Sequence, residues 1–181
     1  MALLAVLVSS CKHETLRYEL TEAARQSIPY ELGQVVTFID SAHQAIDVTV
    51  TADEVYWTIP EDSELGRYSV TLESRIVRLQ SEYDNLDIRM QIFAMNIING
   101  DIYSKLSIKI NSNYFWAPLC FDNVEEQFVS YGGIQYFHDS LEINNKMYYD
   151  VIEDPSQLYY NRTHGILQIR KDEKSVLTIK H

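Results

Sequence analysis

Few of the side chains that could do chemistry in this sequence of 181 residues stand in a recognisable spacing. The histidines are His13, His43, His138, His164 and His181. No two of them are three to five residues apart, so the sequence holds no local pair with the spacing of zinc ligands. It also contains no Gly-x-Ser-x-Gly elbow, no phosphate-binding loop and no dinucleotide fingerprint. We therefore expect a non-enzymatic protein with no catalytic residues, no metal site and no cofactor.

Carboxylates occur in three groups that we expect near loops: Asp53-Glu54, Glu61-Asp62-Glu64 and Glu125-Glu126. Such a group could hold a calcium ion, or one member could act with a distant partner in glycoside hydrolysis. Solvation of an exposed loop is the simpler explanation for each group. A periplasmic hydrolase that works through these carboxylates remains an alternative function.

Cys11 has the sequence surroundings of a lipidated cysteine. Residues 1–10 are apolar and uncharged, end in Val8-Ser9-Ser10, and are too few for the ~20 residues of a membrane span. An aliphatic residue, two small residues and a cysteine form the order of the bacterial lipobox. There the small residues fit the signal peptidase, and the thiol takes up a diacylglycerol as a thioether. We predict that residues 1–10 are a signal peptide and that Cys11 is lipidated.

Two further points bear on the N-terminal segment. No Lys or Arg precedes the apolar run, although an export signal normally begins with positive charge, so we expect the true start codon to lie upstream. The alternative to a signal peptide is that residues 2–8 form a buried strand or helix of the mature fold.

The composition limits the classes of function. Lys and Arg total 15 against 26 Asp and Glu, a net charge of −11, and a surface this acidic repels phosphate backbones. We therefore expect no nucleic-acid partner. Hydrophobic residues make up 46% of the chain, which is enough for a folded core. Besides Cys11 there is one other cysteine, Cys120, and its neighbours Leu119 and Phe121 favour a buried thiol.

Alternating apolar and polar residues predict antiparallel strands with one buried face. The alternating apolar runs are 46–50, 70–72, 86–92 and 106–110. The polar face of the second run would include Thr71 and Glu73. Before these strands, Leu16, Leu20, Ala23 and Ala24 recur at near-helical spacing, with Thr15 or Thr21 as the cap and an end before Pro29. We expect a tether and short helix over residues 11–27, and one all-β antiparallel domain over residues 28–181. It could close as a sandwich, a roll or an open half-barrel.

Turn residues between the runs predict how the strands pair. Residues 40–44 could join two strands, Asn144-Asn145 could form a tight hairpin turn, and residues 171–174 could lead into a last strand at 176–179. Gly132-Gly133 would place Val129 opposite Tyr136. Around Asn99-Gly100 the pleat decides the loop length, because a three-residue loop at 98–100 pairs Met90 with Ile108 and keeps apolar residues on one face. Gly100 would then have positive φ.

Consecutive aromatic residues place a ring on each face of a strand. They occur at 114–116, 148–149 and 159–160. Cross-strand packing is the simpler interpretation of the outward rings. The alternative is contact with a sugar, a lipid or a protein, and the candidate contact residues are Tyr114, Trp116, Tyr149 and Tyr159.

Several segments together resemble small outer-membrane lipoproteins of Bacteroidota. Besides the lipobox they are Ile28-Pro29-Tyr30 with Gly33-Gln34, Ile143-Asn144-Asn145-Lys146, and Tyr159-Tyr160-Asn161 with residues 165–169. The resemblance implies an all-β lipoprotein on the periplasmic side or the outer surface of the outer membrane, and it implies no activity. Asp40-Ser41-Ala42 and Asp139-Ser140-Leu141 also resemble the O-glycosylation signal of these bacteria.

Three functions follow from these observations. The first is a membrane-anchored, non-enzymatic binding or structural module with a protein or glycan partner. The second is a periplasmic carrier of lipid or lipoprotein, with an open apolar half-barrel similar to LolA. The third is the carboxylate hydrolase.

Overall fold

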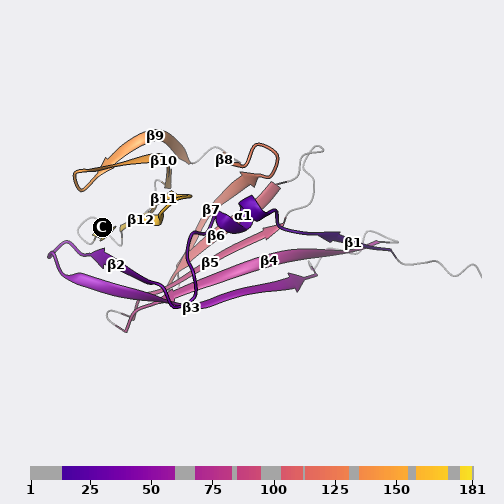
Figure 1. Ribbon diagram of the computed structural model, residues 1–181, viewed down its shortest axis with the longest axis horizontal. Coiled ribbons are helices and arrows are strands. Elements are labelled where there is room, and N and C mark those ends of the chain that lie inside the picture. The colour runs from indigo at the N-terminus through magenta and orange to yellow at the C-terminus, as the bar shows by residue number, and fades with distance from the viewer. Residues whose placement is uncertain are drawn as a thin grey trace, which may run out of the picture.

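The structure is a computed structural model that describes residues 14–59, 68–82, 85–94, 103–111, 113–130, 135–154, 158–170 and 176–180; of residues 14, 68, 69 and 113–118 it describes the backbone. Over these ranges the chain forms strands and one short helix (Figure 1). The elements are β1 (Glu14–Tyr18), α1 (Glu22–Gln26), β2 (Val35–Ile39), β3 (Ala45–Thr58), β4 (Tyr68–Gln80), β5 (Asp87–Ala94), β6 (Tyr103–Ile110), β7 (Asn113–Asp122), β8 (Gln127–Val129), β9 (Tyr136–Ile143), β10 (Lys146–Asp154), β11 (Leu158–Asn161), β12 (Gly165–Arg170) and β13 (Val176–Ile179).

The strands form one continuous sheet that curls into a half-barrel. Its order is β8-β7-β6-β5-β4-β3-β2-β13-β12-β11-β10-β9, with β1 beside β4. Neighbours pair antiparallel, except that β1 runs parallel to the first part of β4. Figure 1 shows α1 lying against one face of the long strands β3 to β7. The predicted all-β single domain is confirmed, and among the three closures proposed it is the half-barrel.

The predicted alternation sets the register of the long strands. Val48, Val50, Ile88, Met90 and Ile92 are all buried on the concave side. Met90 lies opposite Ile108 and Ile92 opposite Leu106, as the three-residue loop requires. Gly100 itself lies outside the described residues. The pleat parity therefore predicted the β5–β6 register correctly.

Two turns and the last strand also agree with the sequence. The β2–β3 turn closes with a hydrogen bond from the Asp40 amide to the Gln44 carbonyl. Asn144 and Asn145 have φ values of 50° and 61°, the left-handed pair that a type I′ turn needs, and Ile143 lies opposite Lys146. The last strand spans Val176–Ile179, while residues 171–175 lie outside the described part of the chain.

Gly132 and Gly133 lie outside the described residues, and the strand pairing expected across them is not present. Val129 pairs with Cys120 of β7, and Tyr136 pairs with Glu153 of β10. β8 and β9 are thus the two ends of the strand order and not neighbours. β8 instead continues from β7 and β9 pairs with β10, which the glycine pair could not reveal.

The N-terminal region begins with a strand where the sequence predicted a tether and helix. Residues Glu14–Tyr18 form β1 against β4, and the helix is confined to Glu22–Gln26. Thr21 caps it as proposed, because its hydroxyl accepts a hydrogen bond from the Ala24 amide at 3.1 Å. Leu16 belongs to the strand, so its helical spacing was misleading, and the sheet already includes Glu14, before the predicted boundary at residue 28.

Two hydrophobic clusters lie on opposite faces of the sheet. The larger fills the concave side and joins α1, Ile28 and Tyr30 to the long strands. The smaller contains Ile143, Tyr148, Val151, Tyr159 and Leu167. Tyr159 and Tyr160 are neighbours in β11 and enter different clusters, as alternation along a strand requires. The β9–β10 hairpin therefore has its own small core.

Candidate functional site

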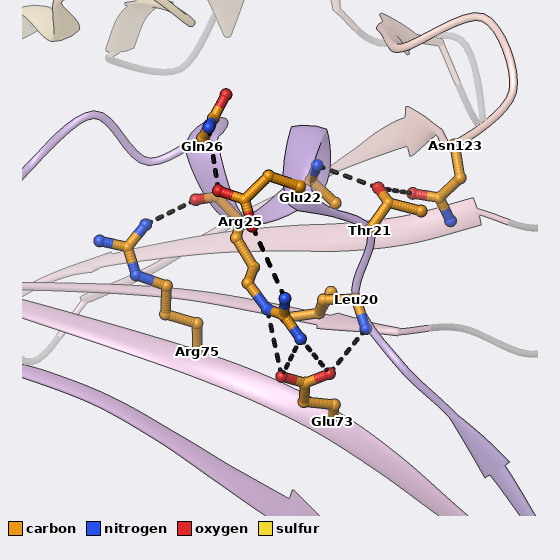
Figure 2. Close-up of polar contacts among 9 residues, drawn as sticks. Leu20, Thr21, Glu22, Arg25, Gln26, Glu73, Arg75 and Asn123 are labelled. Carbon is orange, nitrogen blue, oxygen red and sulfur yellow. Dashed lines mark hydrogen bonds and ion pairs between the residues drawn. The ribbon is translucent and has the colours of Figure 1, made fainter.

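A buried carboxylate on β4 holds the N-terminal region inside the half-barrel. Figure 2 shows Glu73 pointing up from β4 toward α1. Its side chain is 5% exposed and receives both Arg25 Nη2 bonds, at 2.6 and 2.8 Å. The Leu20 amide donates to the same carboxylate at 2.9 Å. The sequence placed Glu73 on the solvent face, which is wrong because its partner Arg25 arrives from 48 residues earlier.

Arg75, two residues along the same face of β4, holds the end of the helix. Its guanidinium donates to the carbonyl oxygens of Arg25, Ile28 and Tyr30 at 2.5, 2.9 and 2.9 Å. Asp53 of β3 accepts from it at 2.8 and 2.9 Å. Carbonyls at a helix C-terminus lack intrahelical partners, and a cation there is favourable. One carboxylate and one guanidinium thus fix both ends of α1.

The region beside α1 combines charged and apolar side chains. A cavity of about 660 Å³ is lined by Arg25, Tyr30, Asp53, Val55 and Arg75 among others. The concave face itself is covered by α1 and by Ile28 and Tyr30, which are buried against it. A lipid carrier needs an apolar concavity, and here the described concave residues pack against the protein's own helix.

A second cavity lies at the seam where the two ends of the sheet approach each other. It measures about 390 Å³ and is lined by Phe128 beside β7 and by Phe137, Asp139, Asp150 and Arg162 on the other side, with five further residues. Arg162 crosses the seam and donates to the Glu126 carbonyl at 2.9 Å. Apolar rings beside a few charged groups, in a volume of this size, are typical of small-ligand sites.

Four polar side chains form a chain of contacts around the small core. His138 Nε2 lies 2.9 Å from Glu153, the Tyr159 hydroxyl donates to Glu153 at 2.9 Å, and Arg170 donates to the Tyr159 oxygen at 2.5 Å. Burial, with the Glu153 carboxylate beside it, raises the pKa of the Tyr159 phenol. Tyr159 is buried and hydrogen-bonded to Glu153 and Arg170, which favours the packing interpretation of this ring over a ligand contact.

The remaining candidate contact residues are Tyr149, Tyr114 and Trp116. Tyr149 is 66% exposed on β10 and is free to meet a partner. Tyr114 and Trp116 lie in β7, where the Tyr114 backbone pairs with Lys109, and their side chains are outside the described part. Cys11 also lies outside it. The sequence missed the seam because its two sides come from residues 126–128 and 137–162, which only the curled sheet brings together.

The other reactive side chains have structural surroundings. Cys120 is buried, and burial raises the pKa of its thiol, as expected of a core cysteine. Asp53 belongs to a strand and an ion pair, so its placement in a solvated loop was wrong, whereas Glu125 and Glu126 are exposed in the β7–β8 turn. Residues 61–64 lie outside the described ranges. Within those ranges no three His, Cys, Asp or Glu side chains are grouped as metal ligands would be.

No protein-family model, no curated protein and no solved structure matches this sequence. Among the described residues, no helix has both the length and the apolar character to cross a membrane.

Proposed function

We propose that the protein is an outer-membrane lipoprotein, anchored through Cys11, that acts as a non-enzymatic binding module. The observation that carries the proposal is the order Val8-Ser9-Ser10-Cys11, followed after two residues by the first strand of the sheet at Glu14. A thioether-linked diacylglycerol with a further acyl chain gives stable anchoring, whereas a single chain does not. The folded domain would therefore be held directly at the membrane surface.

The seam cavity supports the binding role. Phe137 is exposed beside it, and an aromatic ring can stack on the apolar face of a sugar while Asp139 and Asp150 accept hydrogen bonds from its hydroxyls. We propose a glycan as the ligand of this cavity. Titration of the purified domain with a panel of neutral and amino-sugar oligosaccharides tests it. Phe137→Ala should abolish any binding found. Met147→Ala removes an exposed apolar side chain of β10 outside the cavity lining and should leave binding unchanged, whereas equal losses would place the ligand elsewhere.

Fatty-acid labelling tests the anchor. The native gene is expressed in a bacterium fed with labelled palmitate, and the cells are separated into soluble and membrane fractions. Native protein should carry the label and sediment with the membranes. Cys11→Ser should lose both properties and still fold. Cys120→Ser is the matched control, because it removes the other thiol and should keep the label. Native protein without the label, or a Cys11→Ser variant that stays bound to the membrane, would contradict the proposal.

A further inference from the structure

A row of exposed apolar side chains lies at the end of β3. Val55, Trp57 and Ile59 are 54%, 44% and 67% exposed. They are two residues apart, so they lie on one face of the strand. β2 pairs with β3 as far as Thr49, so in the described part the adjoining strand edge beyond the Gln34–Val50 contact has no partner strand. The row is thus both apolar and accessible in the described structure.

The row lies at the end of the sheet where the chain enters it. Thr58 pairs with Leu72, which pairs on its other side with Tyr18 of β1. Ile59 is therefore about level with Arg17, and three residues of strand, about 10 Å, separate that level from Glu14. The three residues from Cys11 to Glu14 span at most about 11 Å. Cys11 can therefore reach the level of Ile59.

The chemistry of the row suits a lipid surface. Trp is enriched at the boundary between headgroups and hydrocarbon, because its ring is apolar and its N–H can still meet water. Arg17 lies with its guanidinium carbon 5.7 Å from the Trp57 ring centre, where it could contact a phosphate while the ring enters the layer. A protein partner would have to compete with a bilayer whose anchor lies within about 11 Å of Glu14, at the same end of the sheet.

We propose that Val55, Trp57 and Ile59 insert into the headgroup layer of the membrane that holds Cys11. This rests on the proposed lipidation of Cys11. The contact is a second membrane signal beside the acyl chains, and it sets the orientation of the domain. The entering end of the sheet faces the bilayer, while the β9–β10 turn, at the other end of the long axis in Figure 1, faces away.

A synthetic anchor tests this contact without relying on acylation in the cell. The protein begins at Cys11 and carries Cys120→Ser and Trp116→Phe, so that Cys11 is its one thiol and Trp57 its one tryptophan. Cys11 is coupled to a maleimide-bearing lipid in phosphatidylcholine vesicles, with or without bromine near the top of the acyl chains. Bromine should quench Trp57 fluorescence strongly, because quenching needs close contact.

The matched control moves the probe to the other end of the sheet. It carries Trp57→Phe and Tyr149→Trp in the same background, and its fluorescence should be the same in both kinds of vesicle. A further variant, Val55→Ser with Ile59→Ser, should lower the quenching of Trp57, since loss of buried apolar side chains shifts insertion by about tenfold or more. Circular dichroism checks that each variant is folded.

Two results would overturn the proposal. One is a Trp57 signal that bromine leaves unchanged, or quenches no more than the control. The other is Trp57 that acrylamide cannot reach in the uncoupled protein, which would mean that another part of the chain covers the row. Both outcomes are independent of palmitate labelling in cells, so failure of the anchor proposal and failure of this one are distinguished.

Discussion

Charged side chains on the concave face of β4 determine where the N-terminal region lies. Glu73 and Arg75 belong to a face that also carries Val77 and Leu79, which are completely buried. Buried charges are unfavourable unless paired and hydrogen-bonded, and both side chains meet that condition through α1 and Asp53. The ion pairs therefore specify the position of α1 as well as contributing to stability.

Glu73→Gln is expected to lower the free energy of unfolding by about 2–3 kcal/mol. The neutral amide of Gln cannot balance the charge of Arg25. The loss of stability stays below that for a fully buried charge, because the Arg25 side chain is 34% exposed. Urea unfolding measures it. Glu22→Gln is the control, since Glu22 is an exposed partner of the same arginine at 3.7 Å and should cost less than about 0.5 kcal/mol. Equal costs for the two variants would contradict the account.

His164 gives stability a dependence on pH. Burial, and then the nearby Lys146, lower the pKa of its imidazole in the folded protein. In the unfolded chain the pKa returns to about 6.5, so below that pH the unfolded chain binds a proton that the folded protein resists. The contribution of His164 is thus fully present above about pH 6.5 and is lost as the pH falls from there toward the folded pKa.

His164→Phe should flatten this part of the pH profile. The phenyl ring can keep the edge-to-face contact with Tyr148, whose ring centre is 5.4 Å away, and it cannot be protonated. Unfolding free energies of both proteins at about pH 7.5 and 5 provide the test, with the window set by the ordinary histidine pKa. If both proteins lose the same stability between the two pH values, His164 is not the group responsible.

At the scale of elements, the connection into β12 shows how a loop is matched to the core. Gly165 has a φ of +76°, and a Cβ atom there would overlap the phenol of Tyr30. That phenol oxygen accepts a hydrogen bond from the Ile166 amide at 2.7 Å. The absence of a side chain at residue 165 therefore lets Tyr30 reach across the half-barrel to β12.

Gly165→Ala should cost about 3 kcal/mol, the sum of a left-handed backbone and an overpacked core. Gly33→Ala is a close match, because Gly33 has a φ of +81° and open space around the position of a Cβ. It should cost about 1 kcal/mol, since only the backbone term remains. Thermal unfolding compares them, and similar costs for the two would show that the Tyr30 contact does not matter.

Elements with a strict two-residue period were predictable from sequence, and long-range partners were not. The β5–β6 register follows from pleat parity alone, since Met90 and Ile108 must share a face. The Asn144-Asn145 turn follows from residues that tolerate positive φ. Gly132-Gly133 also predicts a hairpin turn, but β8 pairs with β7 and β9 pairs with β10. Local propensity cannot rank such competing pairings.

The same limit applies to the candidate contact residues. The exposure of Tyr149 was predictable, because it alternates with the buried Tyr148 along a strand. The burial of Tyr159 was not predictable, because its partners Glu153 and Arg170 come from two other strands. The seam contact between Glu126 and Arg162 joins residues 36 positions apart, and the Arg25–Glu73 pair joins residues 48 positions apart, so no local spacing predicts either of them.

The whole molecule has two ends with different surroundings. The entering end combines β1 with the exposed row Val55, Trp57 and Ile59, and the seam and the β9–β10 hairpin are built from the second half of the chain. In the proposed function the first end meets the membrane and the other structures remain available for a partner. Both assignments depend on the covalent state of Cys11, which is the central claim.

Mass spectrometry of the N-terminal peptide from the native protein, purified out of its own membrane, tests that claim most directly. The account predicts that the peptide begins at Cys11 and carries the mass of a diacylglycerol thioether with an added acyl chain. A native protein that retains residues 1–10, or whose Cys11 has an unmodified thiol, would contradict it.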